Sequence, residues 1–262
     1  MQLFNDILIV GFGELGKRLY NELKIPNIDI RDPYIPEYCN YDNKPYNVAF
    51  ICVPTPTLDD GSVDISYVED AVKNTRARII VIKSTVPVGT CEYLKDKYEK
   101  TIVASPDISG NSLQTPLQDF VVLGGPKKSC DKIAEIYYQI KDSDFRVKIT
   151  DYKTAELFKY MDSAFMALKV TFCNEFADMA KAFGVSYADL RELFISDSRI
   201  NPSHTFVNTK VPFYDSKGLN KDIPALIKQG QISDSEFILP LIRSMKEVNT
   251  YKRHKLVKDN KK

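Results

Sequence analysis

The sequence predicts an α/β protein in which a doubly wound parallel sheet is followed by an all-helical part with one long helix. Three observations support this fold class. An apolar run near the N-terminus ends in a glycine-rich turn, strand and helix patterns alternate as far as Thr150, and a long uninterrupted helical pattern follows. We therefore expect two domains, residues 1–150 and residues 151–262.

The glycine-rich turn follows four apolar residues, 7–10, and reads Gly11-Phe12-Gly13-Glu14-Leu15-Gly16. A short continuous apolar run before glycine is typical of a strand buried on both faces. Apolar positions from Leu15 to Leu23 then recur at helical spacing. Because G-x-G-x-x-G lies here between a strand and a helix, it predicts a Rossmann-type dinucleotide site.

Each glycine of this turn has an expected function. Gly11 allows the tight turn, Gly13 lets a pyrophosphate approach the backbone, and Gly16 lets helix and strand pack closely. The helix N-terminus adds unpaired N–H groups and a positive dipole end. Asp32 follows a second strand, residues 27–31, at the place where an acid accepts adenosine ribose hydroxyls, which favours NAD over NADP. The alternative is a chance glycine turn in an α/β protein.

The composition is ordinary for a globular protein. The 262 residues are 44% hydrophobic and 27% charged, and a formal net charge of +1 gives no general attraction to nucleic acid or membranes. Asn5 and Asp6 interrupt the N-terminal segment, so we expect no signal peptide. No stretch approaches the about 18 apolar residues of a membrane span. A cytoplasmic location is therefore expected.

The cysteine and histidine residues offer little for metal chemistry. We expect the five cysteines, none in C-x-x-C spacing, to be reduced thiols: Cys39, Cys52, Cys91, Cys130 and Cys173. The two histidines, His204 and His254, lie far apart in the sequence. A zinc site or a Ser/His/Asp triad is therefore not expected.

Strand and helix patterns alternate over the first domain. Strands are expected at residues 7–10, 27–31, 48–53, 79–83, 101–104, 120–123 and 146–149. Helices are expected at 15–23, 66–75, 89–98 and 127–140, and the second opens with Ser66-x-x-Glu69 as a capping box. Such alternation is typical of a doubly wound parallel sheet.

One long helix is predicted from Asp151 to Phe183, about 45–50 Å at 1.5 Å per residue. Gly184 is expected to end it. Its apolar positions recur at spacings of three and four: Leu157, Met161, Ala164, Leu168, Phe172, Phe176 and Met179. Because this stripe is long for the helical mass that can cover it, we expect a homodimer through this helix.

The remaining sequence predicts two shorter helices and a loop. Ser186-x-x-Asp189 opens a helix that runs to about Phe194, and residues 199–221 form a loop whose length suggests a functional role. Ser233-x-x-Glu236 starts a last helix, kinked at Pro240. The basic tail from Lys252 is expected to be a solvated, fraying end.

Further stretches combine with the glycine motif. They are Cys52 to Pro56, Lys83 to Thr90, Ser105 to Asp107, Gly124-Gly125, Ala155 to Tyr160 running on to Asn174-Glu175, Ser198 to Ile200, and Leu219 to Asp222. In order and spacing these stretches resemble the UDP-glucose/GDP-mannose dehydrogenase family over nearly the whole chain. The resemblance implies an NAD-binding domain, a helical central domain that forms the dimer, and a third domain that closes over a nucleotide-sugar. We expect this chain to hold the first two only.

The resemblance also implies a reaction. In the family a primary alcohol is oxidised twice, to the acid, with two NAD, and a cysteine thiolate in a G-G-x-C-x-P-K-D motif holds the aldehyde. Here the matching residues run from Asp215 to Asp222, and Gly218 stands at the cysteine position. Because glycine carries no nucleophile, the covalent step cannot occur there. We expect a single alcohol/carbonyl oxidation, or its reverse.

The family's functional residues transfer as follows. The cofactor residues are Gly11, Phe12, Gly13, Glu14, Leu15, Gly16, Asp32, Val53, Pro54, Thr55 and Thr85, and the catalytic residues are Thr85, Asp107, Lys159, Ser163 and Asp222. The substrate loop contributes Lys217, Gly218 and Lys221. Asp107 replaces a family glutamate, Ser163 replaces an asparagine, and a second glutamate is missing between residues 108 and 111.

Simpler interpretations exist for several of these residues. Lys159 can be a solvated helix lysine, Asp222 a helix cap before residues 223–230, and Thr85 a strand end. Cys173 is on the helix face of Lys159 but about 21 Å away along the axis, too far to serve one substrate carbon. His204, in the loop, either contacts a ligand or is exposed.

Two functions remain open from the sequence. The first is an NAD-dependent dehydrogenase acting on a small-molecule alcohol, for which the resemblance implies a nucleotide-sugar. The second is a non-catalytic NAD- or nucleotide-sugar-binding regulatory protein that pairs with a full-length partner. No role with nucleic acid or membranes is expected.

Overall fold

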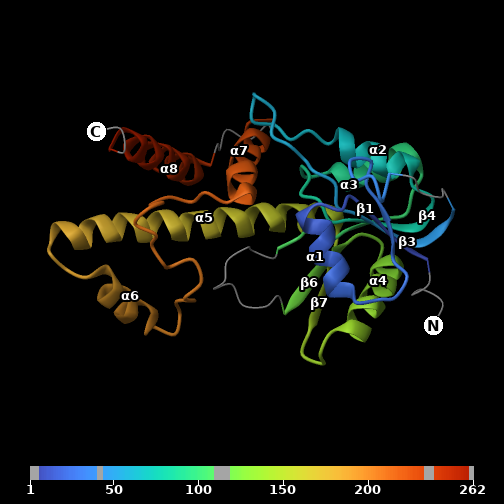
Figure 1. Ribbon diagram of the computed structural model, residues 1–262, viewed down its shortest axis with the longest axis horizontal. Coiled ribbons are helices and arrows are strands. Elements are labelled where there is room, and N and C mark those ends of the chain that lie inside the picture. The colour runs from blue at the N-terminus through green and yellow to red at the C-terminus, as the bar shows by residue number, and fades with distance from the viewer. Residues whose placement is uncertain (1–5, 40–43, 109–118, 233–238, 260–262) are drawn as a thin grey trace. The chain divides into compact units, whose positions relative to one another are not determined.

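The computed structural model describes residues 6–39, 44–108, 119–232 and 239–259 (Figure 1). Within these ranges, the residues up to Ile108 and from 119 to Lys159 form one compact unit, and those from Tyr160 onward form a second. The expected domain division at residue 150 stays a prediction.

The first unit is built on a seven-stranded sheet in the order β2-β1-β3-β4-β5-β6-β7. The strands are β1 (Ile7–Val10), β2 (Asp29–Arg31), β3 (Tyr46–Ile51), β4 (Ala77–Ile82), β5 (Ile102–Ala104), β6 (Phe120–Gly124) and β7 (Arg146–Thr150). β1 pairs in parallel with both β2 and β3, with Ile9 opposite Ile30 on one side and Phe50 on the other. The Rossmann-type α/β fold predicted from the sequence is confirmed.

One strand pair departs from the expected parallel arrangement. β5 and β6 are antiparallel, whereas β6 and β7 are parallel and are joined through helix α4 (Lys127–Ile140). A parallel neighbour requires a crossover connection, usually helical, whereas an antiparallel neighbour does not. The described residues between β5 and β6 contain no helix. The last two strands therefore run against the first five.

Helices cover both faces of the sheet. On one face α1 (Glu14–Leu23) and α4 bury Leu19, Leu23 and Ile133 against alternate strand residues such as Ile9. On the other face α2 (Ser66–Asn74) and α3 (Thr90–Tyr98) pack with the first turns of α5 (Tyr152–Ala182). Strand side chains alternate between the two faces, which explains why the strands read as continuous apolar runs.

The predicted capping box of α2 is wrong. Ile65 is the residue that precedes the helix, and the Asp64 carboxylate accepts the backbone N–H of Ser66 at 2.8 Å. Glu69 turns instead toward α3, where it accepts hydrogen bonds from Lys97 at 2.6 Å and Tyr98 at 2.9 Å. Because Asp64 already accepts an N–H at the start of α2, Glu69 is available to form hydrogen bonds between α2 and α3.

The second unit is helical. It contains α5 beyond Lys159, α6 (Tyr187–Ile195), α7 (Lys217–Ile232) and α8 (Pro240–Asp259). α5 is the long helix that the sequence predicts, and it ends at Gly184, which has a φ of +69°. The N–H of Val185 returns to the carbonyl of Ala180 at 2.8 Å, a Schellman-type ending. The core contains Ala164, Ala167, Tyr214, Ile223, Ile227 and Met245.

Helix α6 begins as predicted, because the Ser186 hydroxyl accepts the N–H of Asp189 at 3.4 Å. The loop prediction for residues 199–221 is wrong at its end, since α7 already begins at Lys217. Ser216 accepts the N–H of Leu219 at 3.2 Å and thereby caps α7. The sequence interpretation overlooked this serine because Gly218 two residues later suggests a turn.

Two expectations at the C-terminal end are also wrong. Pro240 begins α8 rather than kinking it, at the first helical position that proline favours. Lys252 is not solvated: its side chain is buried, and the ammonium donates to the Asn174 carbonyl at 3.1 Å and the Asp178 carboxylate at 2.5 Å. The Ser233-x-x-Glu236 start lies outside the described residues. None of the helices described is both long and apolar enough to cross a membrane.

Candidate cofactor and substrate sites

The strand order places a topological switch at β1, which has β2 on one side and β3 on the other. In open α/β sheets, ligands bind outside the carboxyl ends of strands at such a switch. Gly11 follows β1 there, and its N–H donates to the Arg31 carbonyl at the end of β2 at 2.8 Å. The glycine-rich turn is therefore at the crevice where a dinucleotide fits.

The three glycines differ in what surrounds them. Gly11 has a φ of +91°, and a Cβ there would lie 2.8 Å from the Cys52 backbone. A Cβ on Gly16 would lie 2.0 Å from the Gly11 carbonyl oxygen, whereas one on Gly13 would meet nothing within 4 Å. Two glycines thus serve close packing, and the third leaves open space beside the N-terminus of α1, where a pyrophosphate can reach the backbone.

Asp32 is held rigidly beside this turn. Its side chain is only 9% exposed, and its two carboxylate oxygens accept the N–H of Phe12 at 2.7 Å and of Tyr34 at 2.9 Å. The Phe12 ring meets the edges of Tyr20 and Tyr38 at centroid distances of 5.7 and 5.1 Å. A carboxylate has about four acceptor positions, so Asp32 retains capacity for ribose hydroxyls.

The ends of β3 and β4 carry the other expected cofactor residues. Thr55 donates from Oγ1 to the Thr85 carbonyl at 2.9 Å, and Ser84 donates to the Val53 carbonyl at 2.7 Å. Pro54 is exposed between them. These bonds join the two loops that follow β3 and β4. The structure thus brings Val53, Thr55 and Thr85 together at the carboxyl edge of the sheet.

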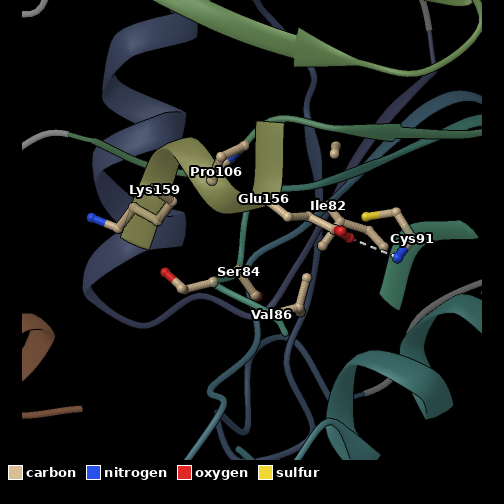
Figure 2. A pocket seen from close by; sticks show the side chains of 9 residues that line it. Ile82, Ser84, Val86, Cys91, Pro106, Glu156 and Lys159 are labelled. Carbon is tan, nitrogen blue, oxygen red and sulfur yellow. Dashed lines mark hydrogen bonds between the residues drawn. The ribbon is translucent and has the colours of Figure 1, made fainter. Parts of the chain in front are cut away.

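A narrow pocket beside Thr85 contains Glu156 and Lys159 on its wall (Figure 2). The Glu156 carboxylate accepts the N–H groups of Gly89 at 2.5 Å and Cys91 at 2.8 Å, and so caps helix α3. Burial raises the pKa of Glu156, although these two bonds oppose the shift. Figure 2 shows the Lys159 amine pointing away from Glu156. Glu156, which the sequence interpretation missed, anchors the first turns of α5.

The volume of this pocket is about 10 Å³, room for about one water molecule. It cannot itself hold a sugar. Its lining brings the α5 turn that carries Lys159 next to the loop after β4, where Glu156 binds the N–H groups of Gly89 and Cys91. Lys159 is half-buried, so the fully solvated helix lysine considered from the sequence is not what the structure shows.

Asp107 forms an ion pair with Arg18 of α1. The pair links the dinucleotide-binding helix to the loop after β5. Lys83 lies fully buried nearby, with Nζ 3.4 Å from the Ser105 hydroxyl. Burial opposes its charge, but neighbouring Tyr137, Asp107 and Glu22 outweigh that effect and raise the pKa of Lys83. The sequence interpretation did not find Arg18, because a half-exposed helix arginine gives no pattern of its own.

Three of the described thiols in this unit are buried and not activated. Burial raises the pKa of Cys52 to about 12 and that of Cys130 to about 11, and it also raises the pKa of Cys91. The thiolate is the nucleophilic form of cysteine, and it is disfavoured at all three positions. The described cysteines are free.

In the second unit Ser163 and Asp222 meet. The Ser163 hydroxyl donates to Asp222 Oδ2 at 2.8 Å, and the Lys221 ammonium is 2.8 Å from Asp222 Oδ1. Both Ser163 and Asp222 are almost fully buried. Because Asp222 is inside α7, the helix-cap interpretation of this residue is wrong.

The expected substrate loop is helical where Lys217, Gly218 and Lys221 occur, in the first turns of α7. Gly218 is exposed, and a Cβ added there would meet nothing within 4 Å. The segment before it is fixed by α8: Asn249 accepts the N–H of Tyr214 at 2.9 Å, and Arg253 pairs with Asp215 at 2.6 Å. These two α8 residues were not found from the sequence.

His204 is half-buried and has a φ of +61°. Burial, and secondarily Lys169, lowers its pKa, so neutral imidazole is favoured. Among the described residues there is no group of three or more His, Cys, Asp or Glu side chains that could hold a metal ion.

Comparison with known proteins agrees with this geometry. Residues 39–141 match the NAD binding domain of the UDP-glucose/GDP-mannose dehydrogenase family, and residues 153–251 match the central domain of the same family. The chain belongs to the UDP-glucose/GDP-mannose dehydrogenase family. The family resemblance inferred from the sequence is thereby confirmed, and so is NAD as the cofactor of the family domain that the chain contains.

Individual relatives support the assignment. A UDP-glucose 6-dehydrogenase of Rickettsia bellii is 35% identical over 227 residues, which are 80% of this chain and 51% of that protein. One from Rickettsia prowazekii is 30% identical over 94% of this chain and 58% of its own length. The chain thus spans slightly more than half the length of these relatives.

A solved structure supports the fold. The UDP-glucose dehydrogenase of Pyrobaculum islandicum superimposes with a TM-score of 0.77 at 21% identity, over 94% of this chain and 68% of that one. At this identity the likeness bears on the fold alone.

Proposed function

We propose that this chain binds NAD and a nucleotide-sugar, and that any oxidation it performs stops after one alcohol-to-carbonyl step. The proposed limit to one oxidation step rests on a single observation. Gly218, in the first turn of α7, occupies the family's cysteine position. Without a thiolate, no thiohemiacetal can form there, so the second hydride transfer has no covalent intermediate. The raised pKa values of Cys52, Cys91 and Cys130 argue against these three thiols as substitutes.

The cofactor residues have separate tasks in this proposal. The turn from Gly11 to Gly16 and the N-terminus of α1 hold the pyrophosphate, and Asp32 accepts the adenosine ribose hydroxyls. Val53, Pro54, Thr55 and Thr85 line the path toward the nicotinamide. When bound, NAD would be the acceptor of the hydride that leaves the alcohol carbon.

The catalytic residues handle the oxygen and its proton. Lys159 stabilises negative charge that develops on the alcohol oxygen, and Ser163, one helical turn further along α5, shares its face. Asp222 accepts a proton or orients a hydroxyl through Ser163. Lys217 and Lys221 supply positive charge for an anionic substrate, such as a nucleotide-sugar diphosphate.

A second candidate is a non-catalytic NAD- or nucleotide-sugar-binding protein that regulates a partner. The ion pair of Asp107 with Arg18 favours it, because this carboxylate, at the family's glutamate position, is already engaged by a cation. The two proposals differ in whether the protein turns over an alcohol.

The proposals are tested by screening nucleotide-sugars and small alcohols for NAD reduction, with mass spectrometry of the products and calorimetry of NAD binding. NAD binding with a carbonyl product supports the single-step dehydrogenase. NAD binding without turnover of any alcohol supports the regulatory protein. Absence of NAD binding would overturn the dehydrogenase, and absence of both NAD and nucleotide-sugar binding would overturn the regulatory protein as well.

We further propose a homodimer through α5. Large apolar side chains are exposed along this helix and at the residue after it: Leu157, Met161, Phe165, Phe172, Phe176, Met179 and then Phe183. Phe172 packs with Phe176 at a centroid distance of 4.6 Å and with Phe194 of α6 at 6.1 Å, so aromatic surface is concentrated there. Exposed apolar stripes of this kind are typical of interfaces. The occupant we propose is a second copy of the chain.

Light scattering at micromolar concentration tests the dimer. Phe176→Glu, within the stripe, should give a monomer, whereas Leu193→Glu, on a more exposed apolar residue of α6, should leave the dimer intact. A monomeric unmodified protein would contradict the proposal.

A further inference from the structure

Glu156 is a buried acid to which neither the sequence nor the proposed function assigns a role. Among the described residues the buried acids are Asp32, Glu156 and Asp222, and the other two belong to the expected cofactor and catalytic residues. The Glu156 side chain is only 3% exposed and lies near the start of α5. A carboxyl group is almost never buried to this extent unless it is paired or hydrogen-bonded, so its partners indicate what it does.

The partners of Glu156 are two backbone N–H groups at the start of α3. Gly89, the residue before this helix, donates at 2.5 Å, and Cys91 donates at 2.8 Å. Gly89 has no side chain with which to accept these hydrogen bonds, and the helix dipole favours a negative charge at this end. Glu156 thus supplies from α5, 65 residues beyond Cys91, the cap that the local sequence of α3 lacks.

The same two bonds fix one end of the loop that carries Thr85. This loop follows β4, and its other end is fixed through the Thr85 carbonyl, which accepts the Thr55 hydroxyl at 2.9 Å. Between the two ends, the Pro87 carbonyl accepts both the N–H and the hydroxyl of Thr90, at 3.1 and 2.7 Å. The loop is therefore fixed at both ends, and at one of them the fixing side chain comes from α5.

Lys159 follows Glu156 by one helical turn. Residues three apart are neighbours on a helix surface, yet Figure 2 shows the Lys159 amine pointing away from Glu156. Both residues line the narrow pocket together with Thr85, and the pocket volume is only about 10 Å³. Such close packing leaves little space for the loop and the helical turn to move relative to each other. Glu156 is thus bonded to the loop that carries Thr85 and lies on the turn that carries Lys159.

We propose that Glu156 is a positioning residue, which sets the place of Thr85 relative to Lys159 by binding the N-terminus of α3. The proposal rests on the proposed function, in which Thr85 lines the path toward the nicotinamide and Lys159 acts on the alcohol oxygen. Hydride transfer requires these groups to be aligned, and a displacement of about 1 Å can cost about 100-fold in rate. The competing explanation is a helix cap that contributes stability alone.

Glu156→Ala and Glu69→Ala form a matched pair that separates these explanations. Glu69 also binds α3, but from α2 and through Lys97 and Tyr98 near the other end of the helix. Chemical denaturation establishes how far each variant is destabilised, and kinetics are measured where both are folded. With the alcohol that the screen identifies, kcat of Glu156→Ala should fall by about 10- to 100-fold with little change in KM. Glu156→Gln, which keeps one acceptor oxygen, should lose less, and Glu69→Ala should keep its kcat.

A second measurement needs neither cofactor nor turnover. Acylation of Lys159 by an N-hydroxysuccinimide ester, followed by mass spectrometry, reports how firmly this lysine is held, and exposed Lys128 of α4 serves as the internal reference. Lys159 should react several-fold faster in Glu156→Ala than in the unmodified protein, because the turn that carries it is no longer tied to the loop. In Glu69→Ala the rate at Lys159 should be unchanged.

The failure of this proposal is distinguishable from the failure of the proposed function. If the unmodified protein oxidises an alcohol and Glu156→Ala behaves like Glu69→Ala in both measurements, the positioning role is overturned while the dehydrogenase stands. If the unmodified protein oxidises no alcohol, the dehydrogenase fails, and the acylation rates alone decide whether Glu156 fixes the turn of Lys159. Equal acylation of Lys159 in Glu156→Ala and the unmodified protein would then overturn the positioning role as well.

Discussion

Ser163 of α5 donates a hydrogen bond from its hydroxyl to the Asp222 carboxylate of α7, with 2.8 Å between the two oxygens. Both side chains are almost completely buried. Ser163 occupies the position to which the family resemblance assigns an asparagine. The bond therefore couples two expected catalytic residues within one helical core.

Ser163→Ala tests what this bond contributes to stability. The variant leaves the buried Asp222 carboxylate without this donor, so unfolding free energy should fall by about 1–3 kcal/mol. Chemical denaturation measures the loss. Ser163→Thr retains a hydroxyl and serves as the control. An unchanged denaturation midpoint in Ser163→Ala would show that other partners of Asp222 compensate for the lost hydrogen bond.

Glu156 predicts a pH dependence of stability. Because burial raises the pKa of this carboxyl above its usual 4.5 in the folded state, the folded protein binds its proton more tightly than the unfolded chain does. The stability that protonated Glu156 contributes is fully present below pH 4.5, and it is lost as the pH rises through the folded-state pKa.

Glu156→Gln removes this titration while keeping an acceptor oxygen for the N–H of either Gly89 or Cys91. The stability difference between the variant and the unmodified protein should therefore shift in favour of the variant as the pH rises from about 4 to 7. Denaturation at several pH values measures it. A difference that does not vary with pH would contradict the raised pKa.

Glu14 is expected to weaken NAD binding. It is the first residue of α1 and is exposed beside Gly13, so its negative charge is close to the place of the pyrophosphate. Glu14→Gln should tighten NAD binding by about 0.3–1 kcal/mol, with a smaller gain at high salt because the repulsion is screened. Calorimetry at two salt concentrations measures this.

The control for Glu14 is Glu99→Gln, which removes an exposed charge at the C-terminal end of α3. Glu99→Gln should leave NAD affinity unchanged. Equal affinity of Glu14→Gln and the unmodified protein at low salt would mean that Glu14 points away from the cofactor.

Asp32 should enforce a preference for NAD over NADP. Its carboxylate can accept two ribose hydroxyls but repels a 2′-phosphate. Asp32→Asn keeps an acceptor for the N–H of Phe12 or Tyr34 and removes the charge. It should therefore weaken NAD binding and reduce the difference in affinity between NAD and NADP. Competitive titration of both cofactors measures the ratio. Equal or tighter NADP binding by the unmodified protein would show that Asp32 is misplaced.

The sequence predicts the fold well where a periodic pattern is strong. The buried strand before Gly11, the helix from Tyr152 to Ala182 and its end at Gly184 all follow from local rules. Helix starts are less predictable, because one side chain decides them. Asp64, and not Ser66, accepts the first N–H of α2, and Ser216 caps α7 inside what reads as a loop.

The site is predicted less completely for a different reason. The glycine-rich turn and Asp32 are local signals that a sequence motif contains. The partner of Asp107 is Arg18, which is 89 residues away in the sequence, and Glu156 caps a helix that begins 66 residues earlier. Pairings over such distances depend on the sheet topology, including the antiparallel β6, and no single-sequence pattern gives them.

The central claim concerns Gly218. A Cβ at this position would meet nothing within 4 Å, so Gly218→Cys fits the start of α7 without a clash. If the protein oxidises an alcohol, this variant should form some acid, provided that the sulfur comes within about 3–3.5 Å of the carbonyl carbon. Lys159→Ala is the control: it should lower the rate by orders of magnitude and leave NAD binding nearly intact.

The most direct test is the number of NADH molecules formed per alcohol consumed by the unmodified protein, with the product identified by mass spectrometry. The account predicts at most one NADH per alcohol and a free aldehyde or ketone, because no thiolate stands at Gly218. Two NADH per alcohol together with an acid product would contradict it, since a nucleophile elsewhere in the protein would then be required.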